Sequence, residues 1–218
     1  MLTVVTLTNN ERPVMLERCK MSVDVALPVN ANHIIVECRS LDEYAQLRYE
    51  SLSLNEYVAF VDDDDTISDN ILNHSISALL STDSGICFTD EIVVNEHNDI
   101  LPSVQRSLMT YSGIFAHPII SHGLTIYKKG VVDSSVLDIH NKYGAGIDWL
   151  MKISAVSNTT AVYIPMVGYY WTNNSSYKSM HTQSNAATNF SRYFRKIQNA
   201  AINTWNVKRG QIPIWLPD

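Results

Sequence analysis

The sequence has few cysteines and no long apolar run, and each shortage excludes a class of protein. Three cysteines occur in 218 residues, at positions 19, 38 and 87. Their odd number and wide spacing argue against a disulfide framework or a zinc site and predict reduced, buried thiols, as in cytoplasmic proteins. No apolar run approaches the roughly 18 residues that span a bilayer. The N-terminal "MLTVVTLTNN" lacks the basic region and cleavage site of a secretory signal. We therefore expect a soluble, cytoplasmic protein without integral membrane association.

The chain is long enough for one substantial core, and its charge is unevenly spread. Of its residues, 45% are hydrophobic, which is typical of a globular domain. The net charge of −6 combines an acidic first hundred residues, with 5 Lys or Arg against 18 Asp or Glu, and a basic remainder, with 11 against 4. This asymmetry predicts that the first half binds cations and the second half binds anions.

Short apolar runs alternate with amphipathic segments, which predicts an α/β fold around a parallel sheet. The stretch 95–125 has weak periodicity and is expected to be irregular. The expected strands cover residues 3–8, 33–38, 57–61, 85–89, 91–94, 124–127 and 161–164. The expected helices begin at Pro13 or cover residues 42–53, 69–80, 147–157 and 185–206. The first helix is expected to carry Val14, Leu16, Cys19 and Met21, and the third an apolar stripe of Ile71, Leu72, Ile76, Leu79 and Leu80.

One stretch, "VAFVDDDDT" at residues 58–66, combines an apolar strand with four consecutive aspartates, Asp62 to Asp65. Four like charges within about 13 Å of extended chain repel one another and require a counter-charge. Solvent supplies it in most acidic loops. Here the run follows a buried strand, and open α/β sheets bind ligands at the carboxyl ends of their strands. The context therefore favours a divalent cation.

Five segments, taken in order, resemble the GT-A glycosyltransferases of the family 2 type. "VVTLTNNERPVMLERC" is similar to the family's opening strand and loop, and "LRYESLSLNEYVAFVDDDD" to its arginine and D-x-D block. "FTDEIVVNEHNDIL", "GLTIYKKGVV" and "VGYYWTNNSSYKSMHTQS" resemble its later hairpin, acceptor-side strand and histidine-containing ending. The resemblance covers roughly residues 3–184.

The resemblance implies a GT-A type fold, that is, a Rossmann-like, mainly parallel sheet flanked by helices, with a smaller acceptor-side sheet and a C-terminal helix. It implies a nucleotide-sugar-binding half at 1–94, an acceptor-binding and catalytic half at 95–184, and a helix and tail at 185–218. The implied reaction moves a sugar from a nucleoside-diphosphate sugar, expected to be a UDP-sugar, to an acceptor hydroxyl. Mn²⁺ or Mg²⁺ would bridge the diphosphate and neutralise the leaving group.

Site residues follow from the matching positions. Asp62 is expected at the ribose side and the metal, and Asp64 at the metal, for which carboxylate oxygens are suitable ligands. His181 stands at the family's histidine, which completes the metal shell or touches the diphosphate; alternatively it is a structural residue. Asp63 and Asp65 are open between a role at the site and helix capping or solvent exposure. The expected contacts of the nucleotide sugar are Thr6, Asn9, Asn10, Arg12, Arg48, Asp62, Asp63 and Lys178, with Lys178 and Tyr177 alternatively in an exposed loop.

The catalytic base departs from the family pattern. Where that pattern has Glu-Asp, the segment "GAGIDWLMKI" has Ala145 and Gly146, and Asp148 falls on the following acid. A slip of two residues would make Asp148 the base, whereas the alternative is a helix N-terminal residue stabilised by the helix dipole. Asp90, at the end of the strand "GICFT", is a second candidate base.

Two other classes of function remain open. A nucleotidyltransferase would bring a Gly-rich phosphate loop after the first strand, and "TLTNNERP" contains no glycine. The missing Glu-Asp pair also allows a catalytically degenerate, metal-binding protein.

For the acceptor, a glycan and a hydroxymethylated base in phage DNA are both open, because basic residues mixed with aromatics can track a phosphate backbone and stack on a base. Those residues are Lys128, Lys129, Arg192, Tyr193, Phe194, Arg195, Lys196, Trp205, Lys208 and Arg209.

Overall fold

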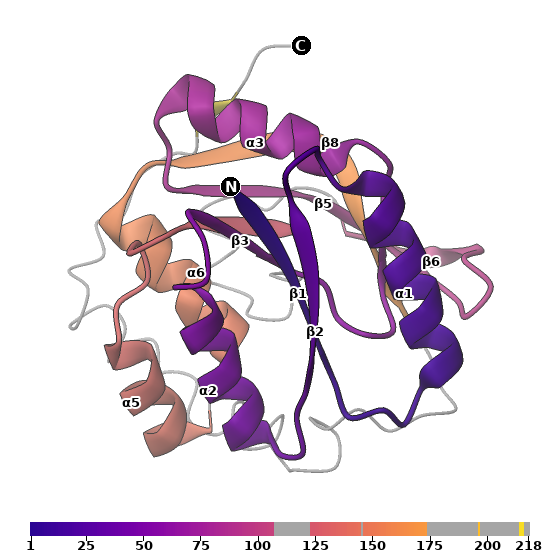
Figure 1. The fold of residues 1–218 in the computed structure, drawn as a ribbon, viewed down its shortest axis with the longest axis horizontal. Coiled ribbons are helices and arrows are strands. Elements are labelled where there is room, and N and C mark those ends of the chain that lie inside the picture. Colours follow the sequence, from indigo (N-terminus) through magenta and orange to yellow (C-terminus); the bar gives the residue numbers. More distant parts are fainter. Residues whose placement is uncertain (107–122, 145, 174–195, 197–213, 216–218) are drawn as a thin grey trace.

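The computed structural model describes residues 1–106, 123–144, 146–173, 196 and 214–215. Its strands are β1 (Leu2–Thr8), β2 (Asn32–Glu37), β3 (Tyr57–Phe60), β4 (Thr66–Ile67), β5 (Ile86–Val94), β6 (Ile100–Arg106), β7 (Thr125–Lys128), β8 (Ala161–Thr172) and β9 (Ile214–Trp215). Its helices are α1 (Pro13–Ala26), α2 (Leu41–Ser51), α3 (Ile71–Thr82), α5 (Ser135–Tyr143) and α6 (Ile147–Asn158). Figure 1 shows the arrangement.

Within the described residues the strands form one sheet of nine strands, in the order β2-β1-β3-β7-β5-β8-β4, with β6 beside β5 and β9 beside β8. The first three strands are parallel, as a Rossmann-like half requires. β7 lies antiparallel between β3 and β5, and β5 is parallel to β8. The expected α/β fold of GT-A type is confirmed. The two expected halves share this one hydrogen-bonded sheet.

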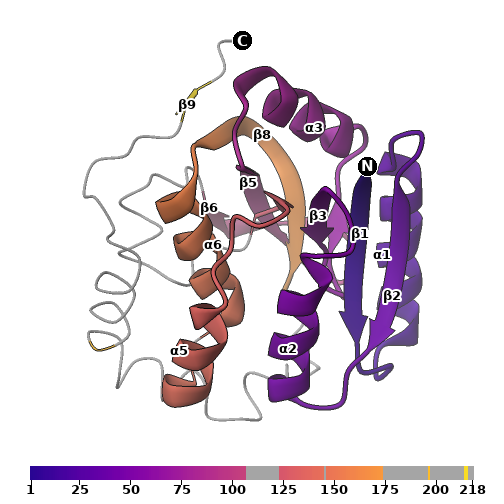
Figure 2. The ribbon, with the colours of Figure 1, turned by 60° about the vertical axis from the view of Figure 1, so that its left-hand side comes forward.

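Helices cover both faces of the sheet, each over its own apolar cluster. One cluster joins α2, α5 and α6 to the sheet, with Trp149, Leu150 and Tyr163 among its members. The other joins α1 and α3 to the opposite face, with Cys19 and Leu72 among its members. Figure 2 shows α5 and α6 beside α2, on one side of the strands. Central strands buried on both faces explain the unbroken apolar runs in the sequence.

Local signals in the sequence set the helix boundaries. Pro13 occupies the first turn of α1, where its missing N–H costs nothing. The Ser40 hydroxyl accepts a hydrogen bond from the Glu43 N–H at 3.1 Å, and the Glu43 carboxylate accepts one from the Arg39 N–H, which caps α2. Gly144 ends α5 in the left-handed region at φ 62°.

Several expected elements differ in the structure. The stretch expected to be irregular contains β6, and one strand, β5, spans residues expected to form two strands. β8 continues to Thr172 instead of ending at residue 164, and α5 was not expected. The three expected thiols are buried and free. The expected C-terminal helix at 185–206 lies outside the described residues except for Lys196, which is helical and exposed.

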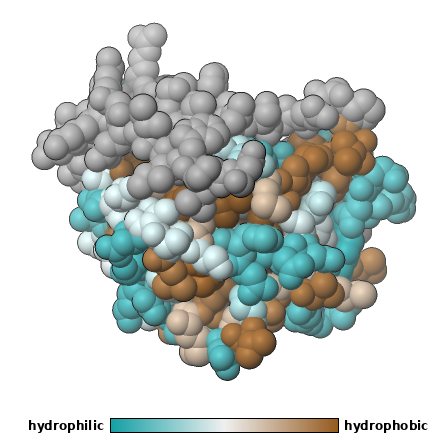
Figure 3. All heavy atoms as spheres, turned by 90° about the horizontal axis from the view of Figure 1, so that it is seen from above, coloured by the Kyte–Doolittle hydropathy of each residue, from teal (hydrophilic) through white to brown (hydrophobic). Residues whose placement is uncertain are grey.

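The buried face of α1 also differs from the expectation. Met15, Cys19, Val23 and Ala26 are buried, whereas Val14 and Met21 are 83% and 63% exposed. The buried residues include Cys19, Val23 and Ala26, which pack in the apolar cluster between α1, α3 and the sheet. On the face of the molecule in Figure 3, hydrophobic and hydrophilic residues are mixed. Among the described residues, no helix is both long and apolar enough to cross a membrane.

Candidate functional site

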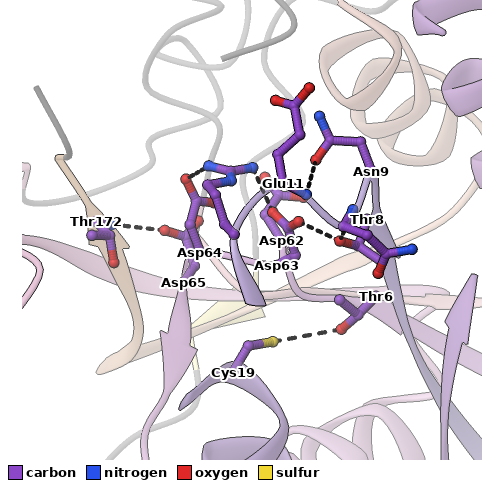
Figure 4. Close-up of polar contacts among 12 residues, drawn as sticks. Thr6, Thr8, Asn9, Glu11, Cys19, Asp62, Asp63, Asp64, Asp65 and Thr172 are labelled. Atoms are coloured by element: carbon purple, nitrogen blue, oxygen red, sulfur yellow. Dashed lines mark hydrogen bonds and ion pairs between the residues drawn. The ribbon is translucent and has the colours of Figure 1, made fainter. Parts of the chain in front are cut away.

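The four aspartates form a tight loop, residues 62–65, directly after β3. Because β1 and β3 are parallel, the loop lies beside the end of β1, where Thr8 and Asn9 begin the connection to α1 (Figure 4). The Asp65 N–H donates to the Asp62 carbonyl at 3.0 Å and closes a turn. The side chains alternate in exposure: Asp63 and Asp65 are buried, whereas Asp62 and Asp64 are partly exposed.

Arginines supply counter-charge to this acid loop. Arg12, just before α1, donates to Asp63 Oδ1 at 2.5 Å and forms a second ion pair with Asp64. Arg48 of α2 donates to Asp62 Oδ1 at 3.0 Å from a buried position. It stacks on the Phe60 ring, with 4.5 Å from the guanidinium carbon to the ring centroid. Arg12 and Arg48 therefore offset part of the electrostatic repulsion among the four aspartates.

Burial and mutual repulsion raise the pKa values of Asp63, Asp64 and Asp65. Desolvation raises the pKa of Asp64 to about 6, with Arg12 opposing the shift and Asp62 adding to it. Desolvation raises the pKa of Asp63, although the Thr8 hydroxyl donates to its carboxylate at 2.6 Å. Asp65 is 1% exposed, and desolvation raises its pKa well above the ordinary value. Keeping these carboxylates ionised in the buried loop costs free energy, and a bound cation would lower that cost.

Of the candidates in the first loop, Thr6 does not face the acid loop. Its side chain is fully buried, with the hydroxyl 2.9 Å from His33 Nε2 and 3.6 Å from Cys19 Sγ, on the α1 side of the sheet (Figure 4). Thr8 makes the contact with the aspartates instead. Asn9 accepts a hydrogen bond from the Glu11 N–H at 3.1 Å and shapes the turn. We therefore replace Thr6 by Thr8 in the candidate site.

Asp148 lies at the first turn of α6 and forms an ion pair with Arg48, which also holds Asp62. Both acids line a small polar cavity of about 20 Å³, roughly the room for one water molecule. Lys152, one turn further along α6, lines the same cavity and is 3% exposed. Desolvation lowers the pKa of Lys152 to about 8, with Asp148 and Glu91 opposing the shift. Arg48 thus forms ion pairs with both Asp62 of the acid loop and Asp148 of α6.

The second candidate base lies elsewhere. Asp90 is in the middle of β5, at an irregularity in its pairing with β8, and its carboxylate accepts a hydrogen bond from the Tyr163 hydroxyl at 2.6 Å. Among the described residues, Asp148 lines the small polar cavity and Asp90 does not. Lys178 and His181 lie outside the described residues.

Two basic residues expected on the acceptor side lie at the far end of the sheet. Lys128 pairs with Tyr57 at the start of β3, whereas the acid loop follows the other end of that strand. The Lys128 ammonium is 3.4 Å from Asp83, and Lys129 donates to the Ser53 carbonyl at 3.1 Å. Lys128 and Lys129 therefore do not extend the candidate site.

The structure adds residues to the site that the sequence did not indicate. The Asp62 N–H donates to the Tyr169 hydroxyl at 3.1 Å, and the Tyr44 hydroxyl donates to Asp62 Oδ1 at 3.3 Å. Arg18 of α1 donates to the Asp64 carbonyl at 2.7 Å. All four of Thr8, Arg18, Lys152 and Tyr169 lie in motif-like segments of the sequence, but Tyr169 and Lys152 are distant in sequence from the loop, and no local pattern pairs them with it.

The acid loop can supply two ligands to a metal ion. Among the described residues, no group of three or more His, Cys, Asp or Glu side chains is placed to hold one. Asp62 and Asp64 are two residues apart and partly exposed, so a cation can reach their carboxylates. Mg²⁺ is often bound by one or two carboxylates together with substrate phosphates and water. The donor set therefore fits a metal that arrives with a diphosphate and not a closed structural site.

Comparisons with known proteins support the fold. No protein-family model and no curated protein matches the chain. The crystal structure of S. aureus TarS 1–349 in complex with UDP-GlcNAc is similar, with a TM-score of 0.65 and 16% identity over 95% of this chain and 68% of that chain. The complex of TarS 1–349 with UDP gives a TM-score of 0.55 and 16% identity over 95% and 75% of the chains. At this identity the likeness establishes the fold, which is GT-A-like.

Proposed function

We propose that the protein is a metal-dependent glycosyltransferase that moves a sugar from a UDP-sugar to an acceptor hydroxyl. The observation that carries the proposal is the acid loop: partly exposed Asp62 and Asp64 stand at the carboxyl end of β3, in a fold similar to that of S. aureus TarS in its complexes with UDP and UDP-GlcNAc. Carboxylates at that edge of an α/β sheet lie where nucleotide ligands bind in open sheets.

The roles of the residues follow from their contacts. Asp64 and Asp62 would hold Mn²⁺ or Mg²⁺, which supplies charge neutralisation for the departing diphosphate. Arg12 bonds both Asp63 and Asp64, so it orients the loop and presents a cation next to the proposed diphosphate position. Arg48, stacked on Phe60 and bonded to Asp62, fixes the other end of the loop.

Asp148 is the base that the geometry favours. It shares the small polar cavity with Asp62, and the buried Arg48 joins the two carboxylates. The Asp148 carboxylate is placed to accept the proton of an acceptor hydroxyl at the cavity mouth. Asp90 does not line the cavity that Asp148 shares with Asp62, which makes it the weaker candidate.

A glycan is the acceptor that we propose. A DNA acceptor would require basic residues of the second half near the acid loop, where they could bind phosphates. Lys128 and Lys129 lie at the opposite end of the sheet from the acid loop, and of the others only Lys196 is among the described residues. Duplex DNA containing hydroxymethylated bases belongs in the acceptor panel as the competing outcome, with binding that falls steeply as salt rises.

The test is a panel of nucleotide sugars assayed for donor hydrolysis and transfer, with and without Mn²⁺. We expect Mn²⁺-dependent release of UDP from one UDP-sugar, abolished in Asp64→Asn. Asp148→Asn should lower kcat by about 100-fold or more with donor affinity unchanged, as for loss of a general base. With pyrophosphate added, formation of UTP and a sugar 1-phosphate from the UDP-sugar would instead indicate a nucleotidyltransferase. Absence of nucleotide binding in the presence of Mn²⁺ would refute the proposal.

A further inference from the structure

Arg18 has three contacts that the proposed reaction does not use. It lies on α1, and its guanidinium donates to the Asp64 carbonyl at 2.7 Å, to the Thr172 hydroxyl at 2.7 Å and to the Glu96 carbonyl at 2.5 Å. Glu96 belongs to the turn between β5 and β6, and Thr172 ends β8. One side chain therefore joins the acid loop to two segments far away in the sequence.

Thr172 is tied to the acid loop a second time. Its N–H donates to Asp65 Oδ1 at 2.7 Å, and both residues are buried (Figure 4). Arg18 thus links the backbone of Asp64 to Thr172 of β8. The side chain of Asp65 binds the same residue directly. We call these contacts of Arg18, Asp64, Asp65, Thr172 and Glu96 the β8 clamp.

The β8 clamp holds the backbone of the acid loop at Asp64. Arg48, Tyr44 and Tyr169 hold the loop at Asp62. At Asp64 the side chain pairs with Arg12, while the backbone carbonyl accepts a hydrogen bond from Arg18. A guanidinium can bond three oxygens in a fixed planar arrangement, whereas a lysine ammonium on a flexible stem cannot reproduce it.

We propose that Arg18 is a positioning residue, which sets the Asp64 carboxylate at the distance from Asp62 that binding of a metal–diphosphate requires. The inference rests on the proposed function, because the ligand is that of the proposed donor site. Arg18 acts through the Asp64 backbone and touches no reacting atom. Residues that orient the ligands of a metal typically change its affinity by about 10- to 100-fold when they are replaced.

The experiment compares Arg18→Met, Arg18→Lys and a control, Lys20→Met, which removes a cation of the same helix whose ion pair is with exposed Glu17. Calorimetry measures UDP affinity with and without Mn²⁺. Hydrogen exchange of the Thr172 amide, without ligand, reports on the β8 clamp. For Arg18→Met we expect UDP affinity to fall about 10-fold or more with Mn²⁺ only, and faster exchange at Thr172. Arg18→Lys should recover part of the UDP affinity and part of the Thr172 protection. Lys20→Met should match the wild type in both measurements.

Each outcome decides the inference. The inference is overturned if Arg18→Met binds UDP with wild-type affinity in the presence of Mn²⁺. It is also overturned if UDP affinity falls equally with and without Mn²⁺, because that result indicates a general structural role. If the wild type binds no UDP, the proposed function fails, and unchanged Thr172 exchange in Arg18→Met then overturns the β8 clamp separately. Should Arg18→Met not fold, Thr172→Val replaces it: this variant loses the hydroxyl but keeps the N–H bond to Asp65, and unchanged UDP affinity overturns the inference.

Discussion

Replacement of Arg48 by methionine tests the buried ion pairs that join the acid loop to α6. Methionine keeps the packing against Phe60 and removes the charge that faces Asp62 and Asp148. Removing one partner of a buried ion pair costs about 3–5 kcal/mol, because the other charge stays buried. Since 34% of the Asp62 side chain and 22% of the Asp148 side chain are exposed, water can return to both. We expect the lower end, about 3 kcal/mol.

The measurement is urea unfolding at pH 7, followed by circular dichroism. For a chain of this size the loss corresponds to a fall in Tm of about 6–12 °C. The matched control is Arg39→Met, because Arg39 is 82% exposed and pairs with Glu37 at the surface at 3.5 Å. That variant should lie within about 0.5 kcal/mol of the wild type.

A double-mutant cycle separates the ion pair from packing. If Arg48 stabilises Asp148, then Asp148→Asn should reduce the cost of Arg48→Met by about 1–2 kcal/mol. Additive effects of the two changes would mean that the pair does not form. A free energy of unfolding for Arg48→Met equal to that of the wild type would contradict the whole reasoning.

Three further predictions concern single groups. Lys152 has its pKa lowered from 10.5 to about 8 in the folded state, so the unfolded chain binds more protons between these values. The free energy of unfolding of the wild type should therefore rise from pH 8 to pH 10 relative to Lys152→Met, whereas Lys128→Met, at a partly exposed position, should track the wild type. The three buried thiols should not react with Ellman's reagent at pH 8 until urea unfolds the chain. Gly146→Asp should fold with unchanged or slightly higher Tm, because a Cβ there meets no atom within 4 Å and aspartate is a good N-cap, and transferase assays will show whether it raises kcat.

The sequence predicted the acid loop and its place because both depend on local patterns. An apolar run of strand length followed by aspartates needs only the geometry of parallel strands to put carboxylates at the sheet edge. The site contacts that were missed depend on distant parts of the chain. Tyr169, Lys152 and Thr172 reach the site from β8 and α6, and the folded topology alone brings them there.

The errors in secondary structure have similar physical causes. β6 contains Pro102 and polar residues and, among the described strands, pairs only with β5. Proline and polar side chains are tolerated at the edge of a sheet, so the sequence lacks the apolar signal of a central strand. In α1 the sequence offers apolar residues on two faces, Val14 and Met21 on one and Met15 and Val23 on the other. Packing against the sheet decides between them.

The alternation of the four aspartates explains why the chain can hold so many carboxylates together. Asp63 and Asp65 point inward and receive hydrogen bonds from Thr8 and from the Thr172 N–H. Because desolvation raises the pKa of both, protonation can lower the charge of the inner pair. Asp62 and Asp64 stay partly exposed, and each is paired with an arginine. A cation that binds the outer pair must compete with Arg12 for Asp64, so the affinity for the metal should depend on a diphosphate that accepts the displaced guanidinium.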